Sequence, residues 1–480
     1  MTFLGVDLGT SGLRAVVMNA QGEVMGSAQC SYGTSNPHSG WSEQDPALWK
    51  VALDQAMGTL RESVEGYEQI QAIAVSGHMH GAVLLDEAGD VLRPCILWND
   101  TRAHHEAAAL DAIPQMRDLS GNIVFAGFTA PKLNWVQRHE PQIYAQVAKV
   151  LLPAAYMNFH LSAQYVGDLS DASGTSWCDV AQRQWSTELL ELGHMRPDQM
   201  PHLVEGASIA GTLRPELAAR WGLSARVTVA GGAGDNAAAA CGIGAIDEGA
   251  GFVSLGTSGV VLIARDAYQA LPDAAVHTFC HAVPERWYQM GVMLSATNSL
   301  NWLGTITGQS PSDLTAALGT QLRPPSDIQF FPYLSGERTP HNDPALRAGF
   351  SALSIEHDQR DLTQAVVEGV SFGLKDCLNA LRQTGAAPEA LYIIGGGAQS
   401  RYWVELLATV LNLPLHLPKG AEFGAALGAA RLAQAAHLGG HLGHMSMPDV
   451  AEVIMPYPAL VDRFEAAYER FVDAVQHRKT

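Results

Sequence analysis

The sequence FLGVDLGTSGLRAVVM (residues 3–18) contains the pentapeptide LGTSG, which recurs at residues 255–259 within GFVSLGTSGVVLIA (251–264). Each copy lies between two short apolar runs, so each predicts a strand, a tight turn and a second strand. A Gly-Thr-Ser-Gly turn offers backbone amides and two hydroxyls in one loop, which suits a phosphate chain. Two such loops predict two related lobes that bind one polyphosphate from opposite sides. Two ordinary hairpin turns are the alternative.

The two copies differ in the residue that ends the preceding strand, which is Asp7 in the first and Ser254 in the second. A carboxylate beside a phosphate loop repels the phosphates unless a cation lies between them. Asp7 therefore predicts a cation at the first loop.

Composition excludes several classes of protein. The 480 residues, 47% of them hydrophobic, predict two or more domains, and the net charge of −19 disfavours nucleic acids and anionic membranes as partners. The sequence has no window of about 18 apolar residues and no basic N-terminal segment followed by a cleavage site. We expect a cytoplasmic protein with six buried, free cysteines, at positions 30, 95, 178, 241, 280 and 377.

Strand-like runs alternate with helical patterns, which predicts α/β lobes. The expected strands are 3–7, 13–18, 70–76, 82–85, 94–98, 227–231 and 392–394, and the expected helices are 47–63, 361–381, 400–411, 421–436 and 458–477. A glycine break between 245 and 252 predicts a first domain over residues 1–246 and a second over 250–436. Residues 437–480 are predicted to be a linker and a closing helix that packs on the lobes.

The common nucleotide-binding motifs are missing. A Walker A loop needs Gly-Lys before Ser or Thr, and the chain has no Gly-Lys dipeptide. The protein-kinase motifs are also absent. The segment GGAGDN (231–236) does follow a strand-like run and open an alanine-rich segment, as in a dinucleotide-binding turn. No acidic residue follows where a ribose ligand belongs, and Asp235 would repel a pyrophosphate, but a nicotinamide-dependent dehydrogenase stays an alternative here.

Asp235 has two interpretations. As a site residue it is a carboxylate on a rigid turn at the end of a strand, where a general base needs to be. As a structural residue it caps the following helix. Gly395–Gly397 predicts a further glycine turn between a strand and a helix, where a flat ring can lie against bare backbone. With two phosphate loops already predicted, this turn is the expected adenosine site.

The histidines do not predict a metal site. None of the three groups has the ligand set typical of zinc: His78 with His80, His277 with Cys280 and His281, and the tail group His437, His441 and His444. We expect His80 to hydrogen-bond a polyol instead.

Several segments together resemble the FGGY carbohydrate kinases. They are GVDLGTSGLR (5–14), WSEQDP (41–46), SGHMHGAVLLD (76–86), LWND (97–100) with Arg102, GFTAPKLNWVQRHEP (127–141), FFPYLSGERTPHN (330–342) and FGAALGAARLAQ (423–434). The first family signature is met by Gly127, Thr129, Lys132, Leu133 and Trp135. The second fits residues 348–368, with Ala352 where the pattern has glycine, a difference expected to affect packing. His78, often glutamine in similar proteins, and one extra residue in GGAGDN are the other departures.

The resemblance implies an α/β fold of two actin-like, ribonuclease H-like lobes around a central cleft, as in actin, heat-shock ATPases and hexokinase. It implies ATP-dependent phosphorylation of D-xylulose at its terminal hydroxyl, with ATP and Mg²⁺ as ligands and a homodimer as a candidate assembly. A kinase acting on ribulose, another pentulose, gluconate or glycerol is the nearest alternative. A chaperone-like nucleotide-binding protein is a second.

The resemblance also implies a role for individual residues. Asp235 is the expected base, and Asp7 is expected to hold Mg²⁺ through water. The expected sugar contacts are Met79, His80, Trp98, Asn99, Asp100, Asp235 and Asn236. The expected phosphate contacts are Thr10, Ser11, Gly256, Thr257 and Ser258, and the expected adenosine contacts are Gly396, Gly397 and Ser400.

Overall fold

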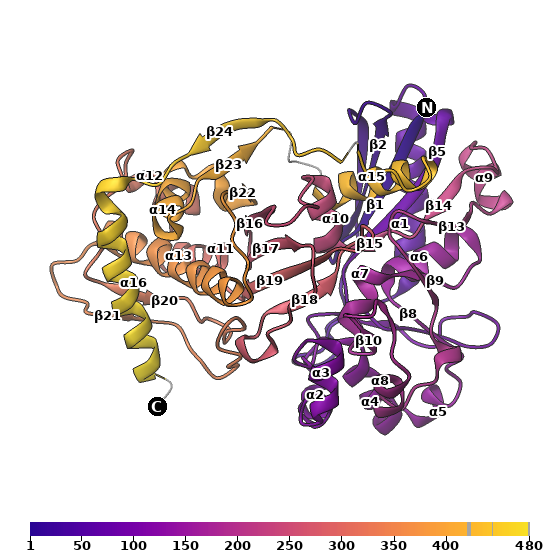
Figure 1. Cartoon of the computed structure of the whole chain (residues 1–480), viewed down its shortest axis with the longest axis horizontal. Helices are drawn as coiled ribbons and strands as arrows, with labels where there is room; N and C mark the ends of the chain where they lie inside the picture. Colours follow the sequence, from indigo (N-terminus) through magenta and orange to yellow (C-terminus); the bar gives the residue numbers. More distant parts are fainter. Residues whose placement is uncertain (420–423, 444, 479–480) are drawn as a thin grey trace.

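The computed structural model describes residues 1–419, 424–443 and 445–478, which form two lobes side by side, each built around a seven-stranded mixed sheet (Figure 1). In the first sheet the order is β13-β14-β5-β1-β2-β3, and β15 also pairs with β5. The strand bounds are β1 Thr2–Leu8, β2 Gly12–Asn19, β3 Val24–Ser31, β5 Ile70–Gly77, β13 Ile209–Thr212, β14 Thr228–Ala230 and β15 Ala233–Gly234.

The second sheet repeats the central part of this topology, in the order β18-β19-β17-β16-β22-β23-β24. In each lobe an LGTSG copy connects a central strand to an antiparallel neighbour, and the next parallel strand lies on the other side. The predicted α/β class with two related lobes is therefore confirmed. The bounds are β16 Gly251–Leu255, β17 Gly259–Arg265, β18 His277–Cys280, β19 Trp287–Met293, β22 Leu391–Ile394, β23 Leu415–Pro418 and β24 Val450–Ile454.

The remaining helices and short strands cover the sheets and form the lower part of the first lobe in Figure 1. In the first lobe they are β4 Glu43–Gln44, α1 Pro46–Ser63, β6 Val83–Leu85, β7 Cys95–Ile96, α2 His104–Asp111, α3 Pro114–Ser120, α4 Thr129–His139, α5 Pro141–Tyr144, β8 Lys149–Leu151, α6 Pro153–Ser162, β9 Val166–Asp168, α7 Leu169–Ala172, β10 Cys178–Asp179, β11 Gln184–Trp185, α8 Thr187–Leu192, β12 His202–Val204 and α9 Pro215–Trp221. In the second they are α11 Thr297–Thr307, α12 Pro311–Ala317, β20 Gln329–Phe331, β21 Gly349–Ser351, α13 Gln359–Gln383, α14 Arg401–Leu411 and α16 Pro458–Arg478.

Two helices, α10 (Asp235–Gly242) and α15 (Gly424–His437), lie between the sheets and share one hydrophobic cluster with strands of both lobes. A Cβ on Gly428 would lie 1.7 Å from the carbonyl oxygen of Ala238, and a Cβ on Gly5 would lie 2.0 Å from that of Ala426. Only glycine allows such contacts, so the small residues of α15 let its backbone lie directly on β1 and α10. Residues 421–423 of the predicted helix lie outside the described part of the chain.

The packing of α15 crosses the predicted domain boundary. This helix contacts β1, β2 and β5 of the first sheet, although it follows most strands of the second sheet in the chain. The boundaries at 246 and 436 stay predictions about sequence units, because the last helix of the second unit lies on the first sheet.

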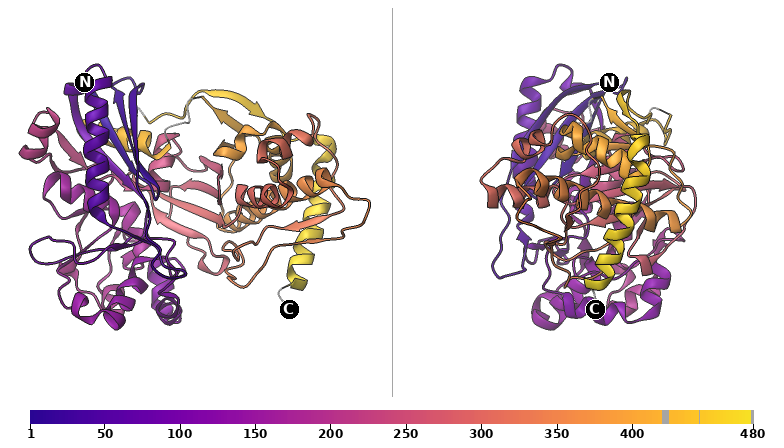
Figure 2. Two further views of the ribbon diagram at one scale, coloured as in Figure 1. Left: turned by 180° about the vertical axis from the view of Figure 1, so that it is seen from behind. Right: turned by 90° about the vertical axis from the view of Figure 1, so that its left-hand side faces the viewer.

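The predicted linker over 437–480 contains a strand that the sequence analysis missed. Strand β24 pairs antiparallel with β23 at the sheet edge, and its short run VAEVI carries too little pattern to be recognised. The closing helix α16 packs on α13 and α14, at the end of the second lobe away from the first (Figure 2).

The expectation of six buried cysteines was wrong for one of them, Cys30. Cys30 is half-buried, the other five cysteines are buried, and all six are free thiols. Among the described residues, none of the helices combines the length and apolarity needed to cross a membrane.

The substitution of glycine by alanine in the second family signature affects the backbone more than the packing. Ala352 is exposed and has φ of 62°, in the left-handed region. A residue with a Cβ pays about 1–2 kcal/mol there, whereas glycine does not. The expectation that this difference affects packing was therefore wrong.

We expect Ala352→Gly to raise the free energy of unfolding by about 1 kcal/mol, because relief of the left-handed strain exceeds the added chain entropy. Urea unfolding of both proteins measures this difference. Ala145→Gly, at an exposed position with no left-handed backbone, is the control and is expected to destabilise. Equal losses in the two variants would contradict the strain at Ala352.

Candidate active site

The two predicted acidic residues lie on or directly after two strands of the first sheet, β1 and β15, which both pair with β5. Asp7 on β1 is the parallel partner of Ser76 on β5, and Ser76 is also the partner of Ala233 on β15. Asp235 follows β15 directly and begins α10. The carboxyl ends of β1, β5 and β15 thus bring Asp7 and Asp235 to the same edge of the sheet, where α/β proteins bind ligands.

In the turn Gly231–Asp235, called here the base turn, the hydrogen bonds that Asp235 accepts from the described residues go to one of its two carboxyl oxygens. Both the backbone N and Nδ2 of Asn236 donate to Asp235 Oδ1, at 2.7 and 2.9 Å. The extra residue in GGAGDN lies in the break between β14 and β15. There Gly232 has φ of 83°, and a Cβ would lie 2.1 Å from the carbonyl oxygen of Val75.

The acids at this edge are stabilised in their neutral forms. Burial, reinforced by the charge of Asp7, raises the pKa of Asp235 to about 7. Burial also raises the pKa of Asp7 to about 6, although a hydrogen bond from Ser76 and the charge of Arg14 act in the opposite direction. Burial therefore opposes the ionisation of both acids, and at Asp235 the charge of Asp7 adds to this effect.

A divalent cation beside these two acids would favour their ionised forms, and such a cation can be bound largely by the phosphates of a substrate. No group of three or more His, Cys, Asp or Glu side chains able to hold a metal occurs in the described ranges. Mg²⁺ commonly binds through one or two carboxylates, water and substrate phosphates. Asp7, beside the first LGTSG loop, offers such a carboxylate.

The carbonyl groups of the first loop (Leu8–Gly12) are held from outside the site. Tyr32 Oη donates to Gly9 O at 2.7 Å, and Tyr32 N donates to Ser11 O at 3.2 Å. Gln44 Nε2 donates to Thr10 O at 2.6 Å. These carbonyls are therefore bound by groups outside the loop, Gly9 N donates to Gly12 O within it at 3.0 Å, and the side chain of Ser11 is exposed.

The second loop (Leu255–Gly259) is held in the same way by the start of α11. Gly256 O accepts from Thr297 N and Thr297 Oγ1, at 2.9 and 2.8 Å, and Thr257 O accepts from Ala296 N at 2.9 Å. Thr257 and Ser258 are exposed. Both copies of LGTSG therefore present the groups that an oligophosphate needs.

A pocket of about 330 Å³ lies next to the second loop. Gly395, with φ of 96°, lies so close to this loop that a Cβ would be 2.7 Å from Leu255 O. Three predicted adenosine contacts, Gly396, Gly397 and Ser400, line the pocket. Its volume is typical of small-molecule sites. The sequence analysis missed the rest of the lining: Thr297, Leu300, Asn301, Pro311, Ser312, Thr315, Gln399 and Trp403.

His80 is held in one orientation. Its Nδ1 lies 2.7 Å from Gly174 O, and its ring stacks on Phe128 with centroids 4.4 Å apart. Burial lowers the pKa of His80 to about 3, so the ring is neutral. Because Nδ1 faces a carbonyl, it carries the proton, and Nε2 is left as an acceptor for a hydroxyl.

Met79, next to His80 in the chain, contacts a residue of the second lobe. The hydroxyl of Tyr288, on β19, lies 3.7 Å from Met79 Sδ. A Cβ on Gly234 would lie 2.8 Å from the Met79 side chain, so Met79 also packs against the base turn. The predicted sugar contacts Met79, Asp235 and Asn236 thus lie together.

The first family signature supports the His80 and Trp98 segments. Thr129 Oγ1 and Lys132 Nζ both donate to His80 O, at 3.2 and 2.7 Å. A Cβ on Gly127 would lie 2.1 Å from Trp98 O. Burial lowers the pKa of Lys132 to about 7, so this lysine is not a permanent charge in the site. Residues of this signature, in α4 and just before it, therefore hold the His80 and Trp98 segments in place.

Trp98, Asn99 and Asp100 divide into two groups. Trp98 is 41% exposed, and its Nε1 donates to Thr10 Oγ1 at 3.0 Å, next to the first loop. Asn99 is exposed beside it. Asp100 is buried, and its carboxylate accepts from Ser42 N at 2.6 Å and from Arg102 at 2.7–3.0 Å. Asp100 supports the Trp98 turn and does not present a free carboxylate.

His78 does not face the candidate ligands. It is 2% exposed and packs edge-on against Trp49. Burial lowers the pKa of His78 to about 3, so it is a neutral ring behind the site. The other histidine groups form no metal cluster within the described residues, and His444 lies outside them.

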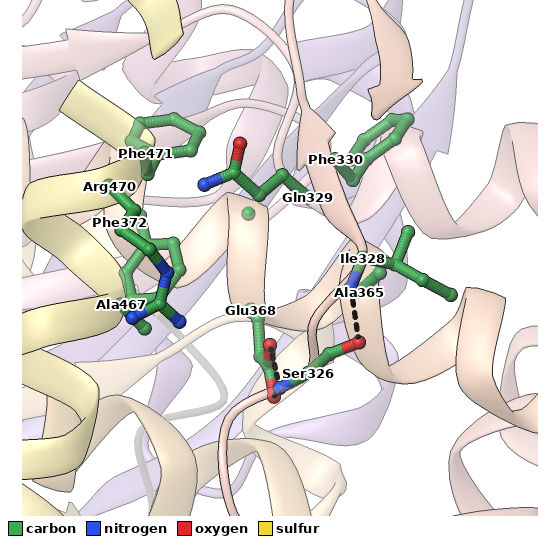
Figure 3. A pocket seen from close by; sticks show the side chains of 11 residues that line it. Ser326, Ile328, Gln329, Phe330, Ala365, Glu368, Phe372, Ala467, Arg470 and Phe471 are labelled. Atoms are coloured by element: carbon green, nitrogen blue, oxygen red, sulfur yellow. Dashed lines mark hydrogen bonds between the residues drawn. The ribbon is translucent and has the colours of Figure 1, made fainter. Parts of the chain in front are cut away.

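A second, much smaller pocket lies between α13, α16 and the segment before β20 (Figure 3). It has room for about one water, with a volume of about 10 Å³. Its Glu368 accepts hydrogen bonds from Ser326 N and Gln364 Nε2. Burial raises the pKa of Glu368 to about 8, which fits a neutral structural acid.

Comparison with known proteins gives consistent relatives over nearly the whole chain. A xylulose kinase from Escherichia coli K12 is 45% identical over 436 residues, 90% of each chain. The structure of a xylulose kinase from Brucella ovis matches with a TM-score of 0.98 and 49% identity over 100% of both chains. That of a xylulose kinase from Rhodospirillum rubrum matches with a TM-score of 0.92 and 28% identity, over 100% of this chain and 99% of the other.

Two family domains account for most of the sequence. Residues 2–242 match the N-terminal domain of the FGGY family of carbohydrate kinases, and residues 251–437 match its C-terminal domain. The two lobes, the repeated phosphate loops and the acids at the sheet edge are thus those of a sugar kinase. The chain belongs to the FGGY family of carbohydrate kinases.

Proposed function

We propose that this kinase transfers the terminal phosphate of ATP to the O5 hydroxyl of D-xylulose, giving D-xylulose 5-phosphate and ADP. The observation that carries the proposal is the placement of Asp235, with its pKa near neutrality, at the same sheet edge as Asp7. Met79, the neighbour of His80, packs against Gly234, the residue before Asp235. The relatives of 45–49% identity, named as xylulose kinases, support the choice of sugar.

In this proposal the sugar lies against Met79 and His80. The neutral Nε2 of His80 accepts a hydrogen bond from a sugar hydroxyl, and Trp98 and Asn99 close the side near the first loop. A carboxyl oxygen of Asp235 accepts the proton of O5 as O5 attacks the phosphorus in line. Phosphoryl transfer needs placement and charge neutralisation more than a strong base, so a base with pKa near 7 is sufficient.

The nucleotide lies between the two loops in the same proposal. Its adenosine occupies the pocket at Gly396, Gly397 and Ser400, and its phosphates lie against Thr10, Ser11 and the second loop. When bound, Mg²⁺ would neutralise phosphate charge next to Asp7. We also infer a cytoplasmic enzyme, since ATP and the six free thiols fit a reducing compartment.

The experiment that tests this function is ADP release measured with a panel of sugars. We expect D-xylulose to give the highest kcat/KM of a panel with D-ribulose, L-ribulose, gluconate and glycerol. A higher value for another sugar would assign the chain to a different FGGY activity. Binding of NADH with no sugar-stimulated ADP release would overturn a kinase altogether.

Replacement of Asp235 tests its role as the base. The prediction that Asp235 caps the helix was wrong, because the N-cap of α10 is Gly234 and Asp235 is the first residue inside the helix. We expect Asp235→Asn to lower kcat by at least ~10²-fold, with the Kd of ATP nearly unchanged, because asparagine cannot accept the proton. Asp45→Asn is the matched control: Asp45 caps α1 by accepting from Ala47 N at 2.9 Å, and asparagine caps equally well. Near-normal turnover of Asp235→Asn, like that of the control, would remove Asp235 from the role of base.

The raised pKa of Asp235 predicts a pH dependence. The base must be ionised, so kcat/KM for MgATP, measured with sugar below its KM, should fall about tenfold per pH unit below about 7. In the enzyme–substrate complex a bound cation and the phosphate loops favour the ionised form of Asp235. The fall of kcat with decreasing pH should therefore begin at a lower pH than the fall of kcat/KM. A kcat/KM that stays constant between about pH 6 and pH 8 would contradict an ionisation of the base in this range.

A further inference from the structure

The base turn is held by contacts outside the predicted site. Gly231 N donates to Ser208 O at 2.8 Å, and Gly232 N donates to Gly206 O at 3.1 Å. These contacts join backbone to backbone, so they do not depend on a particular side chain. They fix the start of the turn, three or more residues before Asp235.

The end of the turn is held by a side chain. The amide of Gly234, the residue before Asp235, donates to Ser170 Oγ at 3.0 Å. Ser170 is fully buried, so water cannot replace its hydroxyl if it is removed. The loss of this contact would leave a buried amide without its acceptor.

Ser170 is itself oriented by a buried carboxylate. Its hydroxyl donates to Asp168, which caps α7 by accepting from Ser170 N at 2.8 Å and from Asp171 N at 3.1 Å. Because the hydroxyl proton is committed to Asp168, a lone pair of Ser170 Oγ faces the amide of Gly234. The order Asp168, Ser170, Gly234 thus forms one directed chain of hydrogen bonds that ends next to the base.

The same segment contacts two other parts of the site. Gly174 O holds Nδ1 of His80, and Ser173 Oγ accepts from Cys280 N on β18 of the second lobe at 3.0 Å. Residues 168–174 therefore connect the base turn, the sugar-facing histidine and the edge of the second sheet.

We propose that Ser170 is a positioning residue for phosphoryl transfer, which sets the place of the Asp235 carboxylate through the amide of Gly234. The inference rests on the proposed function, because it concerns the base of that reaction. Misplacement of a reacting group by about 1 Å can cost about 10²-fold in rate. The adenosine pocket lies in the other lobe, so ATP binding does not depend on Ser170.

The test is a double-mutant cycle of Ser170→Ala and Asp235→Asn, measured as kcat and KM for sugar and MgATP. We expect Ser170→Ala to lower kcat about 10-fold when Asp235 is present, with the KM of MgATP changed by less than about twofold. With Asp235→Asn, Ser170→Ala should change kcat by less than about twofold, because the residue acts through a base that is no longer there.

Ser120→Ala is the matched control. Ser120 is also buried, donates its hydroxyl to a carbonyl and accepts a backbone amide, that of Asn122 at 3.3 Å, but it lies at the end of α3. We expect this variant to lose stability as Ser170→Ala does and to keep its kcat. Thermal unfolding of both variants gives the comparison.

Two outcomes would overturn the role of Ser170. One is a kcat for Ser170→Ala equal to that of Ser120→Ala, and the other is an equal loss with and without Asp235. Should Ser170→Ala fail to fold, Ser170→Cys, with a weaker acceptor of similar size, enters the same cycle. Failure of the proposed function can be told apart from failure of this proposal, because the unmodified enzyme would then prefer another sugar. The double-mutant cycle measured with that sugar would still decide the role of Ser170.

Discussion

The contact on which the site depends is the close approach of α10 and α15 between the two sheets. Gly428 lies against the carbonyl of Ala238, and Gly5 lies against that of Ala426, at distances that no side chain allows. These contacts fix α10, and Asp235 is its first residue. The position of the proposed base relative to both lobes therefore follows from backbone packing in the middle of the molecule.

The two lobes have one topology and different chemistry at the ends of equivalent strands. Next to the first loop, Asp7 and Ser76 are the last residues but one of β1 and β5. Next to the second, Ser254 is the last residue but one of β16, and β22 leads into the bare turn at Gly395. In the proposed reaction, a carboxylate suits the first lobe, where the phosphoryl group is transferred and the sugar hydroxyl loses its proton. A turn without side chains suits the side where a flat base lies against backbone.

In the candidate site, residues that do not face the ligand hold the backbone of residues that are proposed to contact it. Lys132 and Thr129 hold the carbonyl of His80, and Asp168 and Ser170 hold the amide before Asp235. In both cases a buried polar side chain binds the backbone at or next to a residue that we propose faces the substrate. Such contacts place a side chain without touching the ligand, which is why the sugar-facing residues can be few.

The sequence by itself determined the elements whose signals are local: the two LGTSG turns, the acid before the first of them, the glycine turn with Asp235 and the small residues of α15. Turn chemistry and side-chain size act over a few residues, so pattern alone reveals them. Only the tertiary structure decided that α15 lies on the first sheet, that Asp100 is bound by Arg102 and that Ser170 reaches Gly234. These contacts join residues far apart in the chain or turn a side chain away from its expected ligand, and no local pattern encodes them. Ala352 is another example, because the conformational free energy that this residue costs depends on its φ angle, which the sequence does not reveal.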